Sequence, residues 1–130
     1  MGYRVARPIT AFSDAPTGKN SRPVKDEAYL NFIRSLPCLV TKRMPVEAAH
    51  VSYPEPKYGK LGRGKGTKES DRWAVPLCPE EHAKQHSMNE QAYWQGVGID
   101  PVLTALSLYG AYPNEELATM IVLKAGKEQL

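Results

Sequence analysis

The sequence predicts a small α+β domain in which two short strands lead into a helix, with further helices on either side. Three observations indicate this class. Apolar residues recur at helical spacing over 29–36, strand-like runs at 46–51 and 73–77 flank a glycine-rich segment, and a proline opens a polar run at residue 79. The order strand, long loop, strand and helix makes a ββα unit.

Residues 1–24 are expected to form a basic, extended arm, because prolines and a glycine interrupt any regular pattern there. A helix is expected to begin at Asp26 and to stop before Pro37. Its inward residues would be Tyr29, Phe32, Ile33 and Leu36, and the basic residues of the arm and its junction are Arg4, Arg7, Lys19, Arg22 and Lys25.

The first strand is expected from Val46 to Val51 and the second from Trp73 to Leu77. Pro79 suits the first turn of the helix that follows.

Three capping residues, Asn89, Asp100 and Asn114, precede the remaining helical patterns. The first of these helices is expected to end near Gly96 and Gly98 and the second at Gly110. Their apolar stripes are interpreted as core or partner-packing faces.

A chain of 130 residues provides one domain with a modest core. The main domain is expected over 25–99. Residues 100–130 are expected to be a C-terminal helical extension packed on the same domain.

The composition is that of a water-soluble globular protein, with 42% hydrophobic and 24% charged residues and a mean hydropathy of −0.46. No apolar run approaches the ~20 residues that a membrane helix needs, and the N-terminus lacks the apolar core of a signal peptide. We therefore expect a cytoplasmic protein with no membrane partner. The net charge of +3 and pI of 8.9 are only mildly basic.

Charge is concentrated in the glycine-rich segment from Lys57 to Lys68, which has no acidic residue. Such a run on its own is usually a solvated surface loop. Its place between the two strands favours phosphate binding, because glycines let main-chain N–H groups approach a phosphate while the side chains supply charge. The basic residues are Lys57, Lys60, Arg63, Lys65 and Lys68.

The chain has three histidines, and all lie in this ββα region. His82 and His86 are four residues apart, so they share one face of a helix and can reach one cation. His50, at the end of the first strand, could face them as a base. Taken singly, His50 is most simply a core residue and the other two a surface pair; their joint order around a basic loop favours a functional site.

Three segments together resemble the HNH nuclease superfamily: V-E-A-A-H-V over 46–51, G-K-G-T-K-E-S-D over 64–71, and R-W-A-V-P-L-C-P-E-E-H-A-K-Q-H over 72–86. The likeness covers roughly residues 28 to 100. It is greatest to phage and prophage nucleases of the RecA-dependent recombination-enhancement type and to related HNH-like proteins. The resemblance implies a ββα-metal core and a metal-dependent DNA endonuclease, encoded by a phage or prophage and acting in a bacterial or phage-infected host in DNA recombination or processing.

Carried over to this chain, the resemblance makes His50 the general base that activates water. It makes His82 and His86 ligands of one divalent ion, Mg²⁺ or Mn²⁺, with Zn²⁺ as the alternative. Asp71 would either complete the metal site or orient His50 through a hydrogen bond. The residues chosen for contacts to DNA phosphates are Lys68 and Arg72, followed by Lys65 and Arg63.

Two positions depart from the family pattern. Ala49 stands where many relatives have a metal ligand just before the base, and Trp73 stands where they have the asparagine of the motif. Trp73 is most simply a core aromatic residue. Glu47 lies two residues before Ala49 on the same strand face and is interpreted as a solvated charge unless it faces the metal.

Relatives often hold a structural zinc with two C-x-x-C or C-x-x-H pairs, whereas here the second member of each pair is Thr41 or Glu81. Only Cys38 and Cys78 remain, and a structural zinc needs four ligands. We therefore expect no complete structural zinc, with these two cysteines adjacent as small buried residues. A ligand set completed by Glu81 is the less favoured alternative.

Two other function classes remain open. Ala49 and Trp73 favour a catalytically inactive DNA-binding module that kept the fold; a structural interaction protein with a merely solubilising loop is the third hypothesis. DNA is the expected partner. The resemblance adds a recombinase such as RecA, and the C-terminal helices leave a homodimer open.

Overall fold

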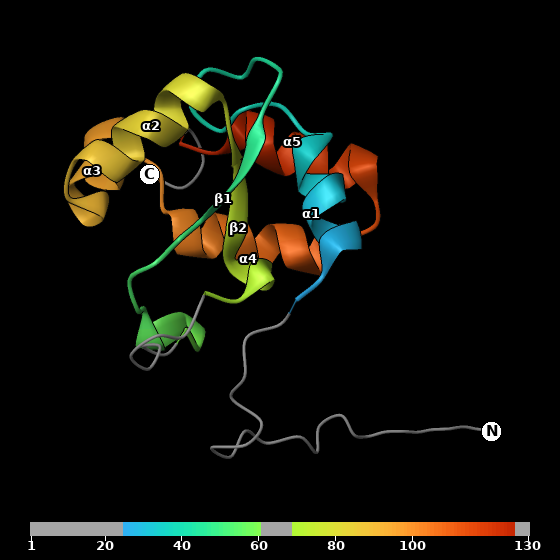
Figure 1. Ribbon diagram of the computed structural model, residues 1–130. Coiled ribbons are helices and arrows are strands. Elements are labelled where there is room, and N and C mark those ends of the chain that lie inside the picture. Colours follow the sequence, from blue (N-terminus) through green and yellow to red (C-terminus); the bar gives the residue numbers. More distant parts are fainter. Residues whose placement is uncertain (1–24, 61–68, 127–130) are drawn as a thin grey trace.

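The computed structural model describes residues 25–60 and 69–126. These residues form an α+β fold with five α-helices and a two-stranded antiparallel sheet. The sheet lies at the centre, with α2 and α3 on one side and α1 and α5 on the other (Figure 1). The predicted arm, residues 1–24, lies outside the described residues.

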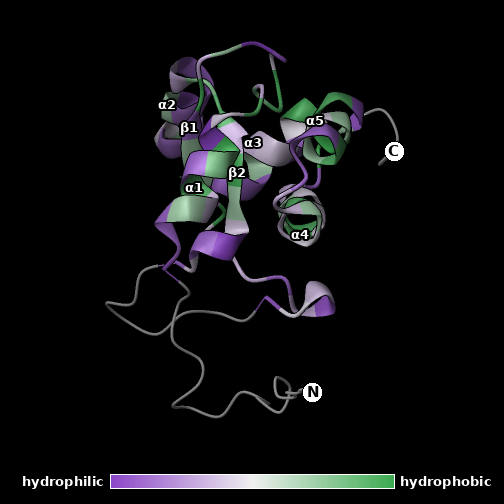
Figure 2. Ribbon diagram, turned by 90° about the vertical axis from the view of Figure 1, so that its right-hand side faces the viewer, coloured by the Kyte–Doolittle hydropathy of each residue, from purple (hydrophilic) through white to green (hydrophobic). Residues whose placement is uncertain are grey.

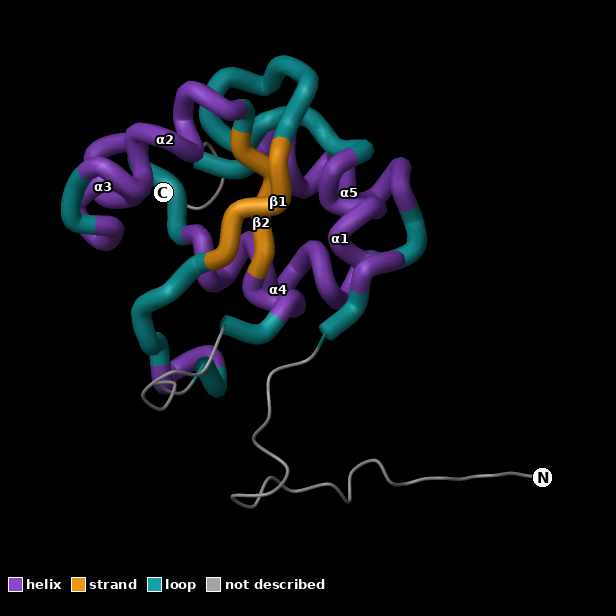
Figure 3. The backbone as a smooth tube through the Cα atoms, viewed as in Figure 1, coloured by secondary structure: helices purple, strands orange, loops and turns teal. Residues whose placement is uncertain are grey.

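The sheet pairs β1 (Glu47–His50) with β2 (Ala74–Leu77). The register sets Glu47 opposite Leu77 and His50 opposite Ala74. All four residues of β2 are buried, because helices cover it, whereas in β1 only Ala49 is buried and Glu47 is exposed. The tube in Figure 3 shows the short sheet held between helical segments. Both strands fall within their predicted ranges.

Helix α1 (Glu27–Arg34) begins where the sequence predicted, because the Asp26 side chain accepts a hydrogen bond from the Tyr29 backbone N–H at 3.0 Å. Helix α2 (Pro79–Ser87) starts with the proline at its first position. It is largely hydrophilic (Figure 2), so it packs on the sheet through few residues and leaves a polar face outward.

The three later helices also begin at their predicted caps. They are α3 (Glu90–Val97), α4 (Pro101–Ala111) and α5 (Glu115–Lys124), capped by the side chains of Asn89, Asp100 and Asn114. Gly98 ends α3 with a φ of 73°, a left-handed conformation that glycine adopts without strain. Helix α4 runs through Gly110 to Ala111 rather than stopping at the glycine.

One hydrophobic core joins these elements. Buried residues of α1, both strands, α3, α4 and α5 belong to the same cluster. Trp73, predicted as a core aromatic residue, is buried in it, and so is Trp94. Lys42 fastens the last helix to the β1 side of the fold, because its ammonium donates to the carbonyl oxygens of Val122 at 2.9 Å and Ala125 at 3.3 Å. Cations are favoured at a helix C-terminus, where unpaired carbonyls gather.

Among residues 25–60 and 69–126, no helix combines the length and the apolar character that crossing a membrane requires.

Candidate functional site

His50 lies at the end of β1 and contacts Asp71, which begins the short 3-10 helix η4 (Asp71–Trp73) before β2. The His50 Nε2 atom is 2.9 Å from Asp71 Oδ1. The other carboxylate oxygen of Asp71, Oδ2, accepts the Asp26 backbone N–H at 2.7 Å. The start of α1 therefore holds the carboxylate that contacts the histidine.

The surroundings of Asp71 favour its charged form. Burial raises the pKa of this carboxyl, but the hydrogen bonds from the Asp26 N–H and His50, with the nearby charges of His50 and Lys25, outweigh burial and bring the pKa below its ordinary value. An ionised carboxylate accepts the Nε2 proton of His50 and leaves Nδ1 as the proton-accepting nitrogen. The His50 side chain is 32% exposed, so a water molecule can reach it. The hydrogen bond between Asp71 and His50, one of the two roles predicted for Asp71, is present.

The other two histidines form a separate group with Glu47. The Nε2 atoms of His82 and His86 are 3.2 Å apart, and their ring centroids are 4.8 Å apart. On the far side of the His82 ring, Nδ1 is 2.7 Å from Glu47 Oε1. One helix face thus presents two imidazole nitrogens toward the same point, and β1 supplies a carboxylate behind one of them.

The spacing of the two Nε2 atoms fits a shared metal ion. A tetrahedral ion with metal–nitrogen distances of about 2.0–2.1 Å holds two ligand nitrogens roughly 3.3–3.4 Å apart. His82 and His86 meet this distance without a change of backbone. Two imidazoles leave the remaining coordination positions to water or to a substrate oxygen.

The metal role predicted for Asp71 stays a prediction, and the contacts described for this carboxylate lie elsewhere. Within the part of the chain that the structure describes, no three His, Cys, Asp or Glu side chains gather as a metal-binding group. The contacts described for Asp71 are to His50 through one carboxylate oxygen and to the Asp26 backbone N–H through the other.

The alternation of side chains along β1 separates His50 from His82 and His86. Successive side chains of a strand point to opposite faces of the sheet, and Glu47 and His50 are three residues apart. Glu47 contacts His82, while His50 contacts Asp71. The histidine–carboxylate pair and the two-histidine pair are therefore two separate groups of the β1, β2 and α2 unit, and the described contacts do not join His50 to His82 or His86.

The predicted phosphate contacts are only partly described. Arg72 is exposed, and its guanidinium lies over the Trp73 ring at 5.6 Å. Arg63, Lys65 and Lys68 lie outside the described residues. The sequence grouped Lys60 with these cations, but its side chain is buried and pairs with Glu69 at 2.9 Å, so it belongs to the interior.

Cys38 and Cys78 are free, buried and adjacent, as predicted. The backbone N–H groups of Val40 and Thr41 both donate to Cys38 Sγ at 3.4 Å, and the Thr41 hydroxyl donates to Cys78 Sγ at 3.8 Å. Burial raises the pKa of Cys38, but hydrogen bonds to its sulfur from Thr41 and from the backbone of Cys78 and Val40 outweigh burial and lower the pKa overall. Burial and the contact with Cys38 raise the pKa of Cys78.

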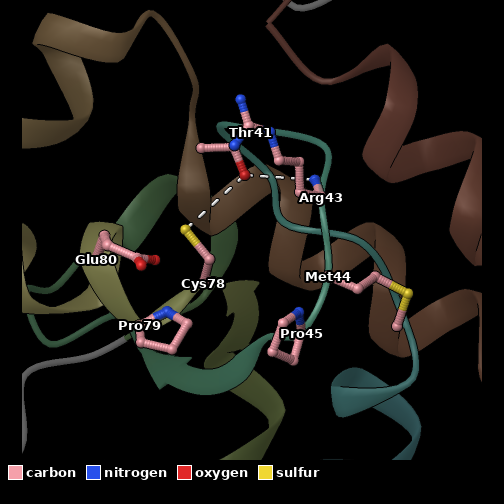
Figure 4. Close-up of a pocket in the computed structure, with 7 residues that line it drawn as sticks. All are labelled: Thr41, Arg43, Met44, Pro45, Cys78, Pro79 and Glu80. Carbon is pink, nitrogen blue, oxygen red and sulfur yellow. Dashed lines mark hydrogen bonds between the residues drawn. The ribbon is translucent and has the colours of Figure 1, made fainter.

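A cavity of about 440 Å³ opens beside Cys78. Figure 4 shows the Cys78 sulfur directed toward Thr41, with Met44 and Pro45 on one wall and Pro79 and Glu80 on another. None of the three histidines lines it. The Glu81 carboxylate accepts the Tyr93 hydroxyl at 2.7 Å, so it has a structural partner of its own. The cavity is distinct from the histidine groups.

Sequence reasoning did not assign Glu47 or the Asp26 backbone N–H to the site. Glu47 shared a predicted strand face with Ala49, which was the available signal, but its reach to His82 depends on how α2 packs on β1. The Asp26 backbone N–H carries no sequence signal at all, because every residue except proline has one.

Comparison with curated proteins and with solved structures gave no match. A family model described as protein of unknown function (DUF968) matches residues 10–112. This match spans most of the 130 residues and includes both strands and all three histidines. The chain therefore belongs to the DUF968 family.

Proposed function

We propose that this protein is a metal-dependent DNA endonuclease with a ββα-metal core like that of the HNH nucleases. The observation that carries the proposal is the pairing of His50 with Asp71 at 2.9 Å, on the same small ββα unit that presents His82 and His86 with facing Nε2 atoms. Hydrolysis of a phosphodiester needs a base for water and positive charge for the phosphate, and the two groups correspond to these needs.

His50 serves as the general base. The Asp71 carboxylate holds the Nε2 proton and orients the ring, so Nδ1 is left to accept a proton from water. Because Asp71 stays ionised near neutral pH, it also stabilises the imidazolium that forms. Asp71 is thus a positioning residue in this proposal rather than a metal ligand.

His82 and His86 would hold the divalent ion. The bound ion supplies positive charge to the phosphate and to the leaving 3′-oxygen. Imidazole nitrogen is a better ligand for zinc-like ions than for Mg²⁺, which prefers oxygen. With Asp71 engaged elsewhere, the donor set favours Zn²⁺ or another transition ion over Mg²⁺, a shift from the sequence-based preference.

Arg72 is the described cation best placed to contact the DNA backbone, since it is exposed and immediately follows Asp71. Phosphate contacts from such residues position a duplex without reading its sequence. Arg63, Lys65 and Lys68 remain predictions for the same role. The partnership with a recombinase, the homodimer and a phage origin also stay predictions.

A plasmid-nicking assay tests the function. The full chain is incubated with supercoiled plasmid and Mg²⁺, Mn²⁺ or Zn²⁺, beside the variants His50→Ala and His82→Ala. Loss of a general base lowers the rate about 10²–10⁴-fold, and loss of His82 should abolish metal-dependent nicking. Glu80→Gln is the matched control, because Glu80 is an exposed residue of the same helix with no histidine contact. Nicking that persists in His50→Ala would refute the assigned chemistry.

The second candidate is a DNA-binding module without catalysis. It is favoured by the burial of Ala49 and Trp73, which occupy the positions where related nucleases carry functional polar residues. This hypothesis expects salt-sensitive retention of DNA with no nicking in any of the three metals, and equal retention by His50→Ala. The same set of proteins therefore separates the two functions.

A further inference from the structure

The contact between Glu47 and His82 links β1 to the helix that carries the proposed metal ligands. Glu47 Oε1 lies 2.7 Å from His82 Nδ1, and the opposite nitrogen of that ring faces His86. We infer that Glu47 is a positioning residue that fixes the tautomer and direction of His82 for metal binding. The inference rests on the proposed function, because it concerns the same metal site.

The strand register explains why the carboxylate comes from position 47. Glu47 and Ala49 share a face of β1, since alternate residues of a strand point the same way. Ala49 is fully buried and its methyl group offers no ligand. Glu47 is the nearest polar side chain on that face, and it lies at the end of β1 that pairs with Leu77, one residue before the Cys78 cap of α2.

The geometry selects one tautomer of His82. A carboxylate accepts hydrogen bonds, so the proton of a neutral His82 ring lies on Nδ1 and the lone pair lies on Nε2. That lone pair is directed at the point between His82 and His86, where an ion would bind. Histidine ligands in metalloproteins usually donate their second N–H to a carboxylate in this way, which fixes the ring and raises its basicity.

His86 completes the arrangement. Without an ion, its Nε2–H can donate to His82 Nε2 across the 3.2 Å gap. The His86 residue is exposed, so its proton can move to Nδ1 through solvent when an ion takes the space between the rings. His82 needs no such change, because Glu47 already holds its proton on the far nitrogen.

An ordinary surface ion pair would look similar but behave differently. The Glu47 side chain is 53% exposed, and an ion pair between exposed groups contributes little to stability. If the contact were only such a pair, replacing Glu47 would leave the affinity for metal unchanged. If Glu47 has a positioning role, replacing it must change both the affinity for metal and the tautomer of His82.

The first measurement is the affinity of the full chain for Zn²⁺, obtained by competition with a chromophoric chelator at fixed pH. Glu47→Ala should weaken binding about 10–100-fold, the usual effect of removing a carboxylate behind a histidine ligand. Glu47→Gln should lose less, because its amide oxygen still accepts the Nδ1–H. Glu80→Gln, which removes one charge from α2 and no hydrogen bond to histidine, should stay within about twofold of wild type.

The second measurement is the tautomer of His82, read from imidazole ¹⁵N chemical shifts without metal. The wild-type chain should show a protonated Nδ1 and an unprotonated Nε2, and Glu47→Ala should show a mixture. Zn²⁺ binding that is equal in wild type and Glu47→Ala would overturn the role of Glu47 alone. Failure of the wild-type chain to bind Zn²⁺, or binding that survives His82→Ala, would overturn the proposed metal site and this inference with it.

Discussion

Removing one partner of the ion pair between Lys60 and Glu69 should be among the most destabilising single substitutions in this fold. The two side chains are only 1% and 8% exposed, and their charged atoms are 2.9 Å apart. The ammonium also lies 5.8 Å from the centre of the Trp73 ring. The pair joins the two ends of the segment 61–68, which carries three of the predicted phosphate contacts, so its removal concerns function as well as stability.

Lys60→Met keeps most of the apolar stem of the side chain but leaves the Glu69 carboxylate buried without its ammonium. Removing one partner of a buried ion pair costs about 3–5 kcal/mol, and the upper half of that range suits side chains as buried as these. For a chain of this size the melting temperature should fall by roughly 10–20 °C, and the urea midpoint should fall by about 2 M.

Urea unfolding followed by far-ultraviolet circular dichroism measures the effect. The double variant Lys60→Met/Glu69→Leu should recover most of the loss, because replacing both charges by apolar groups is often close to neutral. Lys57→Met is the control: this exposed lysine contacts only the Tyr58 ring among the interactions described for it, and its loss should cost about 1 kcal/mol or less. A single variant that loses less than about 1 kcal/mol, or a double variant no better than the single, would refute the reasoning.

Three further predictions concern other parts of the structure. The folded-state pKa of Asp71 is lower than its ordinary value of 3.8, so its contribution to stability is present above about pH 4 and is lost as the pH falls through the folded pKa. Asp71→Asn should therefore lower the free energy of unfolding by about 1–2 kcal/mol at pH 6 and reduce its decrease toward low pH. Urea unfolding between pH 2 and 6 measures this, and an unchanged decrease toward low pH would contradict the prediction. Lys42→Met should cost about 1.5–3 kcal/mol and speed amide exchange in α5, whereas equal exchange rates in both proteins would exclude the capping role. Thr41→Cys/Glu81→Cys should create a tetrahedral four-thiolate site, visible as a Co²⁺–thiolate absorption band that wild type lacks; the absence of a band would mean that the turns after Cys38 and Cys78 do not converge.

The local features of the fold were predictable because short-range rules determine them. Asp26 caps α1, Pro79 starts α2 and Gly98 ends α3, each within one residue of the predicted position. These residues act on backbone groups three or four positions away. Gly110 was misleading because the packing of α4 against the core continues the helix past it.

The histidine–carboxylate pair was predictable for a different reason. An antiparallel pairing of the two predicted strands brings the end of the first near the start of the second, so His50 and Asp71 had to be neighbours. The second partner of Asp71 was not predictable, because the Asp26 backbone N–H that donates to its other oxygen has no sequence signal.

The long-range side-chain contacts were beyond sequence reasoning. Glu47 was interpreted as a solvated charge, and Lys60 as one of a set of basic loop residues. Both interpretations follow from residue type alone, since isolated charges are usually exposed. The packing of α2 on β1 makes Glu47 a partner of His82, and the contacts of Lys60 with Glu69 and the Trp73 ring make Lys60 an interior residue.

Asp26 links the start of α1 to the His50–Asp71 pair. Its carboxylate accepts the Tyr29 N–H at the start of the helix, and its own backbone N–H donates to the Asp71 carboxylate. A truncated chain starting at residue 27 would keep every histidine and yet lose both supports. A fragment that preserves both contacts therefore has to begin at residue 25 or earlier.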